Sequence, residues 1–373
     1  MKKIAILLGV LTLAVSCKTS STVSSKGSLK DSYKNNFYIG TAMSLPQIHG
    51  TDAKSDDIIK KQFSSIVAEN CMKSMFLQPQ EGQFFFDDSD KFVEFGEKNK
   101  MFIIGHTLIW HSQLPKWFFT DKDGKDVLAE VLKERMKNHI SAVVTRYKGR
   151  VKGWDVVNEA IMEDGSYRKS KFYEILGEEF IPLAFQYAHD ADPEAELYYN
   201  DYNEWHTGKI KTVSKIVQTL KSRGIRIDGV GMQAHVDLKS PSIEEYEKAI
   251  LEYTSNDVKV NITELEVSVL PSPWGTSANI ADRVEYDAKM NPYTKGLPEY
   301  VKTEWENRYL DFFKLFLKHQ DKIRRVTLWG VTDNQSWKND FPVKGRTDYP
   351  LPFDRNYQAK PIVKKLIQLT EEK

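Results

Sequence analysis

Short runs of apolar and β-branched residues alternate with longer amphipathic stretches along most of this 373-residue chain, and no other feature constrains its fold as strongly. Parallel strands that are buried on both faces appear as continuous apolar runs, and the helices that connect them appear as amphipathic stretches. The sequence contains eight strand-like runs, at residues 37–43, 71–77, 102–109, 151–157, 196–200, 229–234, 258–263 and 326–331. Eight strands separated by helices predict an α/β fold, a single (β/α)8 or TIM barrel.

The stretches between these runs have the apolar spacing of helices with one buried face. They include residues 127–147, 181–191, 210–223, 243–253 and 309–319. From residue 36 onward the chain has no low-complexity segment and no second linker, so we expect residues 36–373 to form one domain. This length is large for one domain but lies within the range of a barrel with long loops.

Polar and aromatic side chains gather at the ends of nearly all the predicted strands. Barrel enzymes carry their functional groups at the carboxyl ends of the strands, whereas an open doubly wound sheet concentrates them at one switch point, so this distribution favours a barrel. In chain order these side chains are Glu69, Asn70, Lys73, His106, Trp110, His111, Gln113, Asn158, Glu159, Asn200, Asp201, Tyr202, Gln233, His235, Glu264, Glu266, Trp329, Asp333 and Trp337.

Two of these segments place a glutamate where an apolar strand ends: WDVVNE, which ends at Glu159, and VNITELE, which contains Glu264. Cleavage of a glycosidic bond requires such a pair, because one carboxyl must protonate the departing oxygen while the other must be ionised to attack or stabilise the sugar carbon. The apolar Trp154 and the donors Asn158 and His235 supply the environments that would separate the two pKa values.

Four longer motifs, GHTLIWHSQLPKW, WDVVNEA, ITELEVSVLP and LWGVTDNQSW, resemble those of glycoside hydrolase family 10, the retaining endo-β-1,4-xylanases. The resemblance extends from about residue 36 to residue 366, and several long motifs in the right order are far more specific than one short pattern. It implies a (β/α)8 barrel, which agrees with the strand count. It also implies endo-acting hydrolysis of the β-1,4-xylosidic linkages of xylan by a retaining double displacement. We expect neither a cofactor nor a bound metal.

By its position in these motifs, Glu159 matches the acid/base of the family, Glu264 matches its nucleophile, and Asn158 matches the asparagine that bonds the sugar 2-hydroxyl. A buried structural role is the alternative for His106 and for tryptophans beside strands. The remaining positions that the resemblance assigns to substrate binding are Glu69, Asn70, Lys73, His106, Trp110, Gln113, Tyr202, Gln233, His235, Trp329 and Trp337, with Tyr202 expected to stack on the leaving side.

One position departs from the usual pattern of the family. The family usually shows TELD, where the aspartate holds the histidine that bonds the nucleophile, and this chain has Glu266 instead. Glutamate is one methylene longer, so His235 is expected to keep an acidic partner at a shifted angle. Both residues are therefore predicted to support the nucleophile.

The N-terminal segment resembles a bacterial lipoprotein signal. Two lysines precede an uncharged stretch at residues 4–16, which is too short to remain as a membrane-spanning helix. The residues before Cys17 resemble a lipobox, although Ala14 stands where leucine is usual. We expect cleavage of residues 1–16, lipidation of Cys17 and a flexible tether over residues 17–35, giving an exported protein that contacts the membrane only through its lipid. Ordinary secretion is the alternative.

Charge and cysteine content limit the partners. Lys and Arg total 53 against 52 Asp and Glu, and loss of Lys2 and Lys3 with the leader turns a net charge of +1 into about −1. Such a chain has no field that attracts nucleic acid, and it fits neutral partners such as xylan or xylo-oligosaccharides. With Cys17 lipidated, Cys71 has no disulfide partner and is expected to be buried.

Other function classes fit less well. A metal-dependent barrel hydrolase needs a ligand set, and His106, His111 and His235 lack the His-x-His spacing after the first strand. A non-catalytic glycan-binding lipoprotein would keep the tryptophans but lose a carboxylate, and both glutamates are present. A related retaining glycosidase that acts on another β-glycan is the nearest alternative. The sequence leaves the oligomeric state open.

Overall fold

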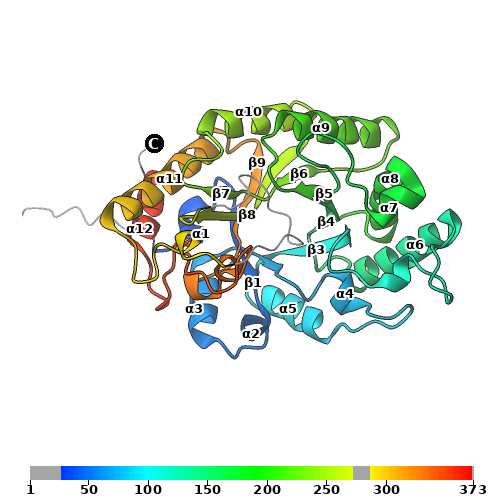
Figure 1. The fold of residues 1–373 in the computed structure, drawn as a ribbon, viewed down its shortest axis with the longest axis horizontal. Helices are drawn as coiled ribbons and strands as arrows, with labels where there is room; N and C mark the ends of the chain where they lie inside the picture. Colours follow the sequence, from blue (N-terminus) through cyan, green and yellow to red (C-terminus); the bar gives the residue numbers. More distant parts are fainter. Residues whose placement is uncertain (1–26, 272–285, 372–373) are drawn as a thin grey trace, which may run out of the picture.

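The structure, a computed structural model, describes residues 27–271 and 286–371. Eight parallel strands form a barrel that helices surround (Figure 1), and the sheet is closed because β6 pairs with β8 and β1 pairs with β9. The predicted (β/α)8 fold is confirmed. The barrel strands are β1 (Tyr38–Met43), β2 (Ser65–Ala68), β3 (Phe102–Trp110), β4 (Gly153–Asn158), β5 (Glu196–Asp201), β6 (Gly229–Met232), β8 (Lys259–Ser268) and β9 (Ile323–Leu328).

The second strand was wrongly predicted at residues 71–77. The barrel strand is β2, and its neighbours β1 and β3 pair with its four residues in parallel register. Ile66 and Val67 are β-branched and fully covered, as a central parallel strand requires, whereas the apolar residues of 71–77 are unbranched at Cβ and form a turn and a short helix. The correction places Glu69 directly after the carboxyl end of β2.

A short additional strand, β7 (His235–Asp237), follows β6 after a two-residue interruption. Ala234 has a positive φ of 63°, which turns the chain so that β7 pairs with the far half of β8 instead of continuing β6. In this register His235 lies directly beside Glu266. The interruption therefore brings a histidine from one strand next to a carboxylate of its neighbour.

The helices cover the outside of the barrel, and the five predicted ones correspond to α6, α8, α9, α10 and α11. The last begins at Glu299 rather than at residue 309, because buried Val301 and Trp305 continue the helical spacing toward its N-terminus. None of the helices in the two described ranges is long and apolar enough to cross a membrane. The α-helices are α1 (Leu29–Tyr33), α2 (Leu45–Ile48), α3 (Ala53–Gln62), α4 (Ser74–Leu77), α5 (Asp87–Lys98), α6 (Ala129–Arg146), α7 (Lys171–Leu176), α8 (Phe180–Ala191), α9 (Thr207–Ser222), α10 (Ile243–Thr254), α11 (Glu299–Lys318) and α12 (Pro361–Leu369).

The domain begins earlier than the predicted boundary at residue 36. Helix α1 starts with a side-chain cap from Ser28, and Leu29 and Tyr33 are buried. The Tyr33 hydroxyl donates to the backbone oxygen of Leu366 in α12 at 2.8 Å, so the two ends of the described chain pack together. The tether predicted over residues 17–35 was therefore too long, because residues 28–35 belong to the folded domain. Cys17 and the predicted signal lie outside the described residues.

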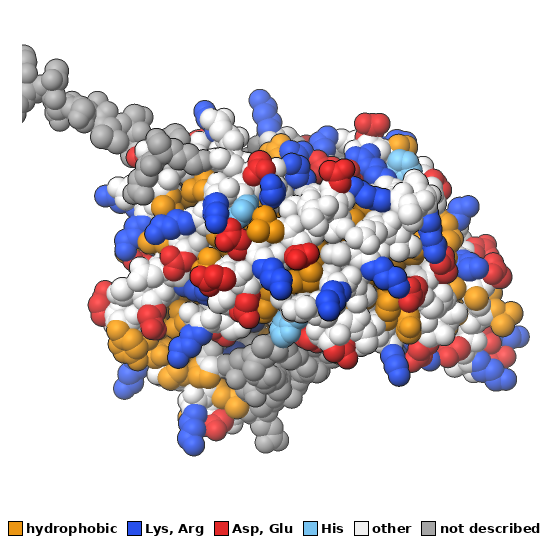
Figure 2. Space-filling model, turned by 90° about the horizontal axis from the view of Figure 1, so that it is seen from above, with side chains coloured by type: hydrophobic (Ala, Val, Ile, Leu, Met, Phe, Trp, Pro, Cys, Tyr) orange, Lys and Arg blue, Asp and Glu red, His pale blue; other side chains and the backbone are white. Residues whose placement is uncertain are grey.

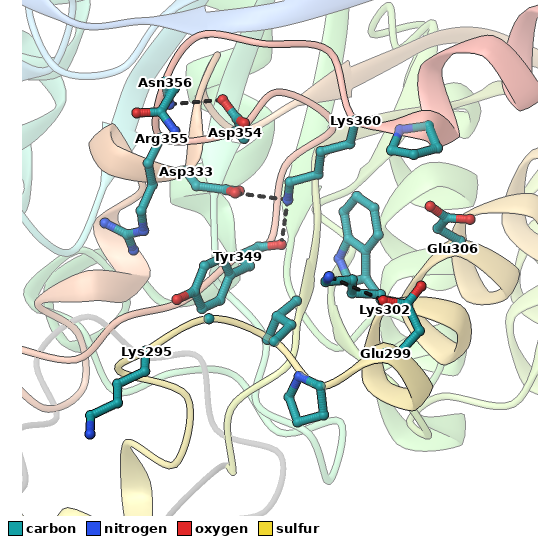
Figure 3. Close-up of a pocket in the computed structure, with 15 residues that line it drawn as sticks. Lys295, Glu299, Lys302, Glu306, Asp333, Tyr349, Asp354, Arg355, Asn356 and Lys360 are labelled. Carbon is teal, nitrogen blue, oxygen red and sulfur yellow. Dashed lines mark hydrogen bonds and ion pairs between the residues drawn. The ribbon is translucent and has the colours of Figure 1, made fainter.

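A buried ion pair anchors the long connection from β9 to α12. The Lys360 ammonium lies 2.8 Å from the carboxylate of Asp333 and donates to the backbone oxygen of Tyr349 at 2.9 Å (Figure 3). The same ammonium stands 4.2 Å above the ring of Trp305. These groups line a pocket between the start of α11 and the connection (Figure 3). The same connection also contains Trp337, which belongs to the site described below.

Replacing Lys360 by Met should lower the free energy of unfolding by roughly 3–5 kcal/mol, because the fully buried Asp333 would lose its counter-charge. The matched control is Lys302→Met, which removes an exposed pair with Glu299 and should cost less than about 1 kcal/mol. Burial raises the pKa of Asp333 to about 6 although Lys360 opposes the shift, so the Lys360→Met deficit should be smaller at pH 5, where the carboxyl is largely protonated, than at pH 8. Urea unfolding at both pH values tests this, and equal deficits for the two variants would contradict it.

Candidate active site

A pocket opens where the carboxyl ends of the barrel strands meet. Ten side chains line it, and they come from β3, β7 and β8, from the ends of β4 and β6, and from the segments after β2 and β9. All ten were predicted from the sequence as site residues. They are Lys73, His106, Trp110, Asn158, Glu159, Gln233, His235, Glu264, Trp329 and Trp337.

Glu159 follows the last residue of β4 and has a positive φ of 57°. This conformation turns its side chain out of the strand direction. Its backbone N–H donates to the backbone oxygen of Asn200 at 2.9 Å. One carboxylate oxygen accepts from the Trp110 indole at 2.8 Å, and the other accepts from the amides of Asn158 and Gln233, both at 3.1 Å. The three donors are neutral, so they orient the carboxyl without a counter-charge at hydrogen-bond distance.

Glu264 lies within β8 and has a different environment. One carboxylate oxygen accepts from the Asn200 amide at 2.9 Å, and the other lies 3.2 Å from Nε2 of His235. Burial alone would raise the pKa of Glu264, but the hydrogen bond and charge of His235, the charge of His106 and the bond from Asn200 outweigh burial and lower it. Glu264 is therefore held in its ionised form.

His235 carries the positive charge that this arrangement needs. Desolvation opposes that charge, but hydrogen bonds to Glu264 and Glu266 raise the pKa of His235 to about 9. Nδ1 lies 2.8 Å from Glu266 and Nε2 faces Glu264, so an imidazolium donates from both ring nitrogens. The prediction that Glu266 supplies an acidic partner to His235 agrees with this geometry.

Replacing His235 by Asn should move the acidic limb of the kcat/KM profile to higher pH. The neutral amide cannot supply the charge that lowers the pKa of Glu264, so this carboxyl would take up its proton at a higher pH and be ionised over a narrower range. The control is His49→Asn, because His49 is exposed and pairs with Asp88 away from the pocket. A His235→Asn profile whose acidic limb coincides with that of the wild type would rule out this account.

Asn200, at the end of β5, joins the two halves of the site and was not assigned a role from the sequence. Its amide nitrogen donates to Asn158 and to Glu264, both at 2.9 Å, while its oxygen accepts from Thr263 at 2.7 Å. Gly231 on the neighbouring strand makes room for it, since a Cβ there would stand 2.2 Å from the Asn200 oxygen. The one sequence feature that could have indicated this role is the place of Asn200 in the polar NDYN segment that ends β5.

The segment after β2 brings Lys73 into the pocket. Its ammonium donates to Gln113 at 2.7 Å and to Asn70 at 3.1 Å, and it stands 5.0 Å from the centre of the Trp110 ring. Burial lowers the pKa of Lys73, while Glu69 and the other site carboxylates oppose the shift. Glu69 lines an adjoining hollow together with Trp329 and Trp337, and burial raises its pKa against the effect of Lys73.

Inside the barrel, a chain of charged groups supports the floor of the site. His106 contacts Asp155 at 3.0 Å, and the other oxygen of Asp155 accepts from Arg325 at 3.3 Å. All three side chains are buried. Trp329 stands edge-on to His106, with ring centres 5.5 Å apart. Asp155 and Arg325 were not assigned a role from the sequence, because an isolated charge within an apolar strand does not reveal its partner.

Tyr202 does not line the pocket. Its side chain is 1% exposed, its hydroxyl accepts from Arg168 at 2.7 Å, and Lys209 stands 4.1 Å from its ring. The buried pair of Lys209 and Asp201 accounts for this position, since it draws the end of β5 against α9. The stacking on the leaving side expected from the sequence therefore does not fit this arrangement.

The described residues offer neither a cluster of metal ligands nor an exposed thiol. Residues 27–271 and 286–371 contain no group of three or more His, Cys, Asp or Glu side chains that could hold a metal ion. Cys71 is free and buried, as predicted.

Comparison with known proteins gives a consistent family. Residues 28–369 match the sequence profile of glycosyl hydrolase family 10. Endo-1,4-beta-xylanase A of Xylanibacter ruminicola is 47% identical over 365 residues, 98% of each chain. The structure of a family 10 endoxylanase from a sugarcane soil metagenome has a TM-score of 0.88 at 46% identity, covering 91% of this chain and 99% of that one. A mutant structure in complex with xylotriose has a TM-score of 0.82 at 35% identity, covering 91% of this chain and 99% of that one. This chain is therefore a member of glycosyl hydrolase family 10.

Proposed function

We propose that this chain is an endo-1,4-β-xylanase that cleaves xylan with retention of configuration, with Glu264 as nucleophile and Glu159 as acid/base. The observation that carries the proposal is the contrast between two glutamates in one pocket: Glu264 contacts the imidazolium of His235, whereas Glu159 is held by neutral donors. Retaining glycosidases need such a pair, one carboxyl ionised for attack and the other able to donate a proton.

In the first step, a carboxylate oxygen of Glu264 bonds to the anomeric carbon while the bond from this carbon to the leaving sugar oxygen breaks. The proton of Glu159 passes to that oxygen, so the shortened chain leaves as a neutral alcohol. Asn158 donates to Glu159 and accepts from Asn200, which also donates to Glu264, and it is suited to bond the sugar 2-hydroxyl. The product of this step is an ester between the sugar and Glu264.

In the second step, Glu159 accepts a proton from water, and the water oxygen bonds to the anomeric carbon as the ester bond to Glu264 breaks. Two inversions at one carbon restore the β configuration. Each glutamate ends in the protonation state in which it began. The mechanism uses only side chains that line the pocket.

Xylan is the proposed substrate because relatives at 47% and 40% sequence identity are named endo-1,4-beta-xylanases, and a related structure was solved with xylotriose. The molecule has no large single-sign surface in the view of Figure 2, where basic and acidic side chains are interspersed, which suits a neutral polysaccharide. We propose that Trp329 and Trp337 form the floor and wall of the sugar sites. The polar ligands proposed for the sugar are Glu69, Asn70, Lys73, His106, Trp110, Gln113, Gln233 and His235.

A substrate panel tests the proposal: xylan, arabinoxylan, cello-oligosaccharides and mixed-linkage glucan, each with product sizing and with Glu264→Ala as the blank. We expect short xylo-oligosaccharides from internal cleavage and little reaction on the glucans. Preferred cleavage of a glucan would indicate a glycosidase for another β-glycan. Binding of xylan without release of reducing sugar would indicate a non-catalytic binding protein.

We further propose that residues 1–16 are an export signal, that Cys17 is lipidated, and that the enzyme reaches its substrate from a membrane anchor facing the periplasm or the cell exterior. The support is the abrupt end of the uncharged stretch at Cys17 and the polar, Ser-rich residues that follow it. Xylan is too large to enter a cell intact, so export also agrees with the proposed substrate.

Replacing Cys17 by Ala should release the protein from membranes, because it removes the only proposed attachment. The matched control is Cys71→Ala, which changes the other cysteine of the chain and should leave the protein in the membrane fraction. Fractionation and incorporation of labelled palmitate measure the effect. Recovery of both wild type and Cys17→Ala as soluble, signal-cleaved protein would overturn the anchor.

A further inference from the structure

The carboxylate of Glu266 contacts two parts of the site at once. A single oxygen, Oε1, accepts from Nδ1 of His235 at 2.8 Å and from the indole nitrogen of Trp337 at 2.8 Å. The Lys338 ammonium lies 3.6 Å from the same oxygen. Glu266 is fully buried, and it lines neither the active-site pocket nor the adjoining hollow that contains Glu69. It therefore acts through its neighbours rather than on the sugar.

We propose, building on the function given above, that Glu266 is a positioning residue. One of its carboxylate oxygens holds both Trp337, the wall of the sugar site, and His235, the residue that supports the nucleophile. Two donors fill the two acceptor positions of a carboxylate oxygen, so neither can shift without loss of a charge-assisted hydrogen bond. Lys338 supplies positive charge from outside this pair. The nucleophile and the sugar wall are thereby held at a fixed distance from each other.

The surroundings of Trp337 support this role. One face of its indole stacks on Phe341, with ring centres 4.6 Å apart and planes 21° apart, and the ring of His235 stands edge-on at 5.1 Å. Stacking leaves an aromatic ring free to slide and rotate in its own plane, and the bond from its nitrogen to Glu266 removes that freedom. The indole therefore has one orientation before any sugar binds.

The length of the side chain at position 266 decides whether this arrangement is possible. His235 and Glu266 are direct partners in the pairing of β7 with β8, so their backbones are fixed relative to each other. An aspartate would bring the carboxylate back by one carbon–carbon bond, about 1.5 Å. It could stay near His235 or move toward Trp337, but it could not keep both 2.8 Å contacts without a shift of a strand or of the turn at Trp337–Asn339. The longer glutamate side chain therefore makes the shared contact possible.

We expect Glu266→Asp to show two defects, one in substrate affinity and one in the preference between sugars. Release of the indole should raise KM and lower kcat/KM for an aryl xylobioside by roughly 10–100-fold, the effect of losing a hydrogen bond to a charged group. It should also reduce the preference for the xylobioside over the matching cellobioside, because a movable wall excludes the extra hydroxymethyl group less well. Glu266→Gln keeps the length but loses the charge, so it should instead mainly shift the acidic limb of the pH profile through His235.

A double-mutant cycle tests the coupling. Trp337→Phe keeps a stacking ring but removes the N–H, so combining it with Glu266→Asp should cost clearly less than the product of the two single effects. The control is Glu266→Asp combined with Gln113→Ala, whose amide bonds Lys73 and not this cluster; these effects should multiply. Multiplicative effects in the Trp337 cycle, with an unchanged sugar preference, would overturn the proposal.

A measurement without substrate separates this proposal from the proposed function. The indole N–H resonance of Trp337, identified by its absence from Trp337→Phe in a ¹H–¹⁵N spectrum, should move upfield in Glu266→Asp as its bond to the carboxylate is lost. A resonance that stays in place would contradict the positioning role even in an active xylanase. A resonance that moves, in a protein inactive on xylan, would leave the positioning role standing and refute the proposed function.

Discussion

Replacing Glu264 by Ala should reduce turnover of xylan and of activated aryl xylobiosides alike, by roughly 10⁴–10⁶-fold, the range seen when central catalytic residues are removed. The first bond to the anomeric carbon comes from this carboxylate whatever the leaving group, so a better leaving group cannot compensate for its loss. Steady-state rates on both substrates measure the effect. The variant should remain folded, because the alanine removes a buried charge together with one of the two carboxylate partners of His235.

Added azide provides the control for this variant. The anion fits the space vacated by the carboxylate and can attack the anomeric carbon directly, in a single displacement that yields an α-glycosyl azide. Recovery of activity with this inverted product would assign the nucleophile to Glu264. Loss of activity on xylan alone, with normal rates on aryl xylobiosides, would show that Glu264 serves as the acid instead.

Replacing Glu159 by Ala should affect the two substrate types differently. Protonation of the leaving oxygen contributes about 10²–10⁴-fold when the leaving group is a sugar, and little when it is an activated phenol that departs unaided. Xylan hydrolysis should therefore fall by that factor, while formation of the glycosyl-enzyme from an aryl xylobioside continues. The second step loses its base, so the intermediate should accumulate and appear as a burst of phenol in stopped-flow measurements.

Azide should rescue Glu159→Ala with retention of configuration, because it attacks an intermediate that has already been inverted once. Glu159→Gln is a useful second variant, since its amide keeps one oxygen, which can accept from either Trp110 or Asn158, but it cannot protonate the leaving oxygen. Equal losses on xylan and aryl substrates in the glycosylation step, or rescue with inversion, would show that the two roles have been exchanged.

The sequence was sufficient for the architecture because the apolar runs and the polar groups at their ends both recur with every strand of the barrel. It failed where that signal was weak. The four-residue strand β2 has too few residues to stand out beside the longer apolar run after it, and β7 exists only because Ala234 turns the chain. The N-terminal boundary of the domain was predicted too late in the chain, because the short helix α1 has only five residues and follows a Ser- and Lys-rich segment.

Within the site, the residues that line the pocket were found from the sequence, as was the contact of Glu266 with His235, but the other residues that act through a neighbour were not. Glu159 and Glu264 end recognisable motifs, whereas Asn200 acquires its role only because β5 lies between β4 and β6 in the closed sheet. The contact between Glu266 and Trp337 spans 71 residues of sequence. Tyr202 shows the opposite error: a residue in the right motif can be drawn into the core by a buried ion pair. Motifs predict which residues gather at the site, and only the packing of the folded chain determines which of their side chains line the pocket.

The stereochemistry of the first product shows whether Glu264 bonds covalently to the sugar. Xylohexaose would be mixed with the enzyme and the anomeric protons followed by ¹H NMR before mutarotation. We expect internal cleavage products whose new reducing ends appear first as the β anomer, with the α anomer growing later at the rate of mutarotation, because a nucleophilic Glu264 imposes two inversions. Early appearance of the α anomer would mean a single displacement by water, and it would contradict a covalent role for Glu264.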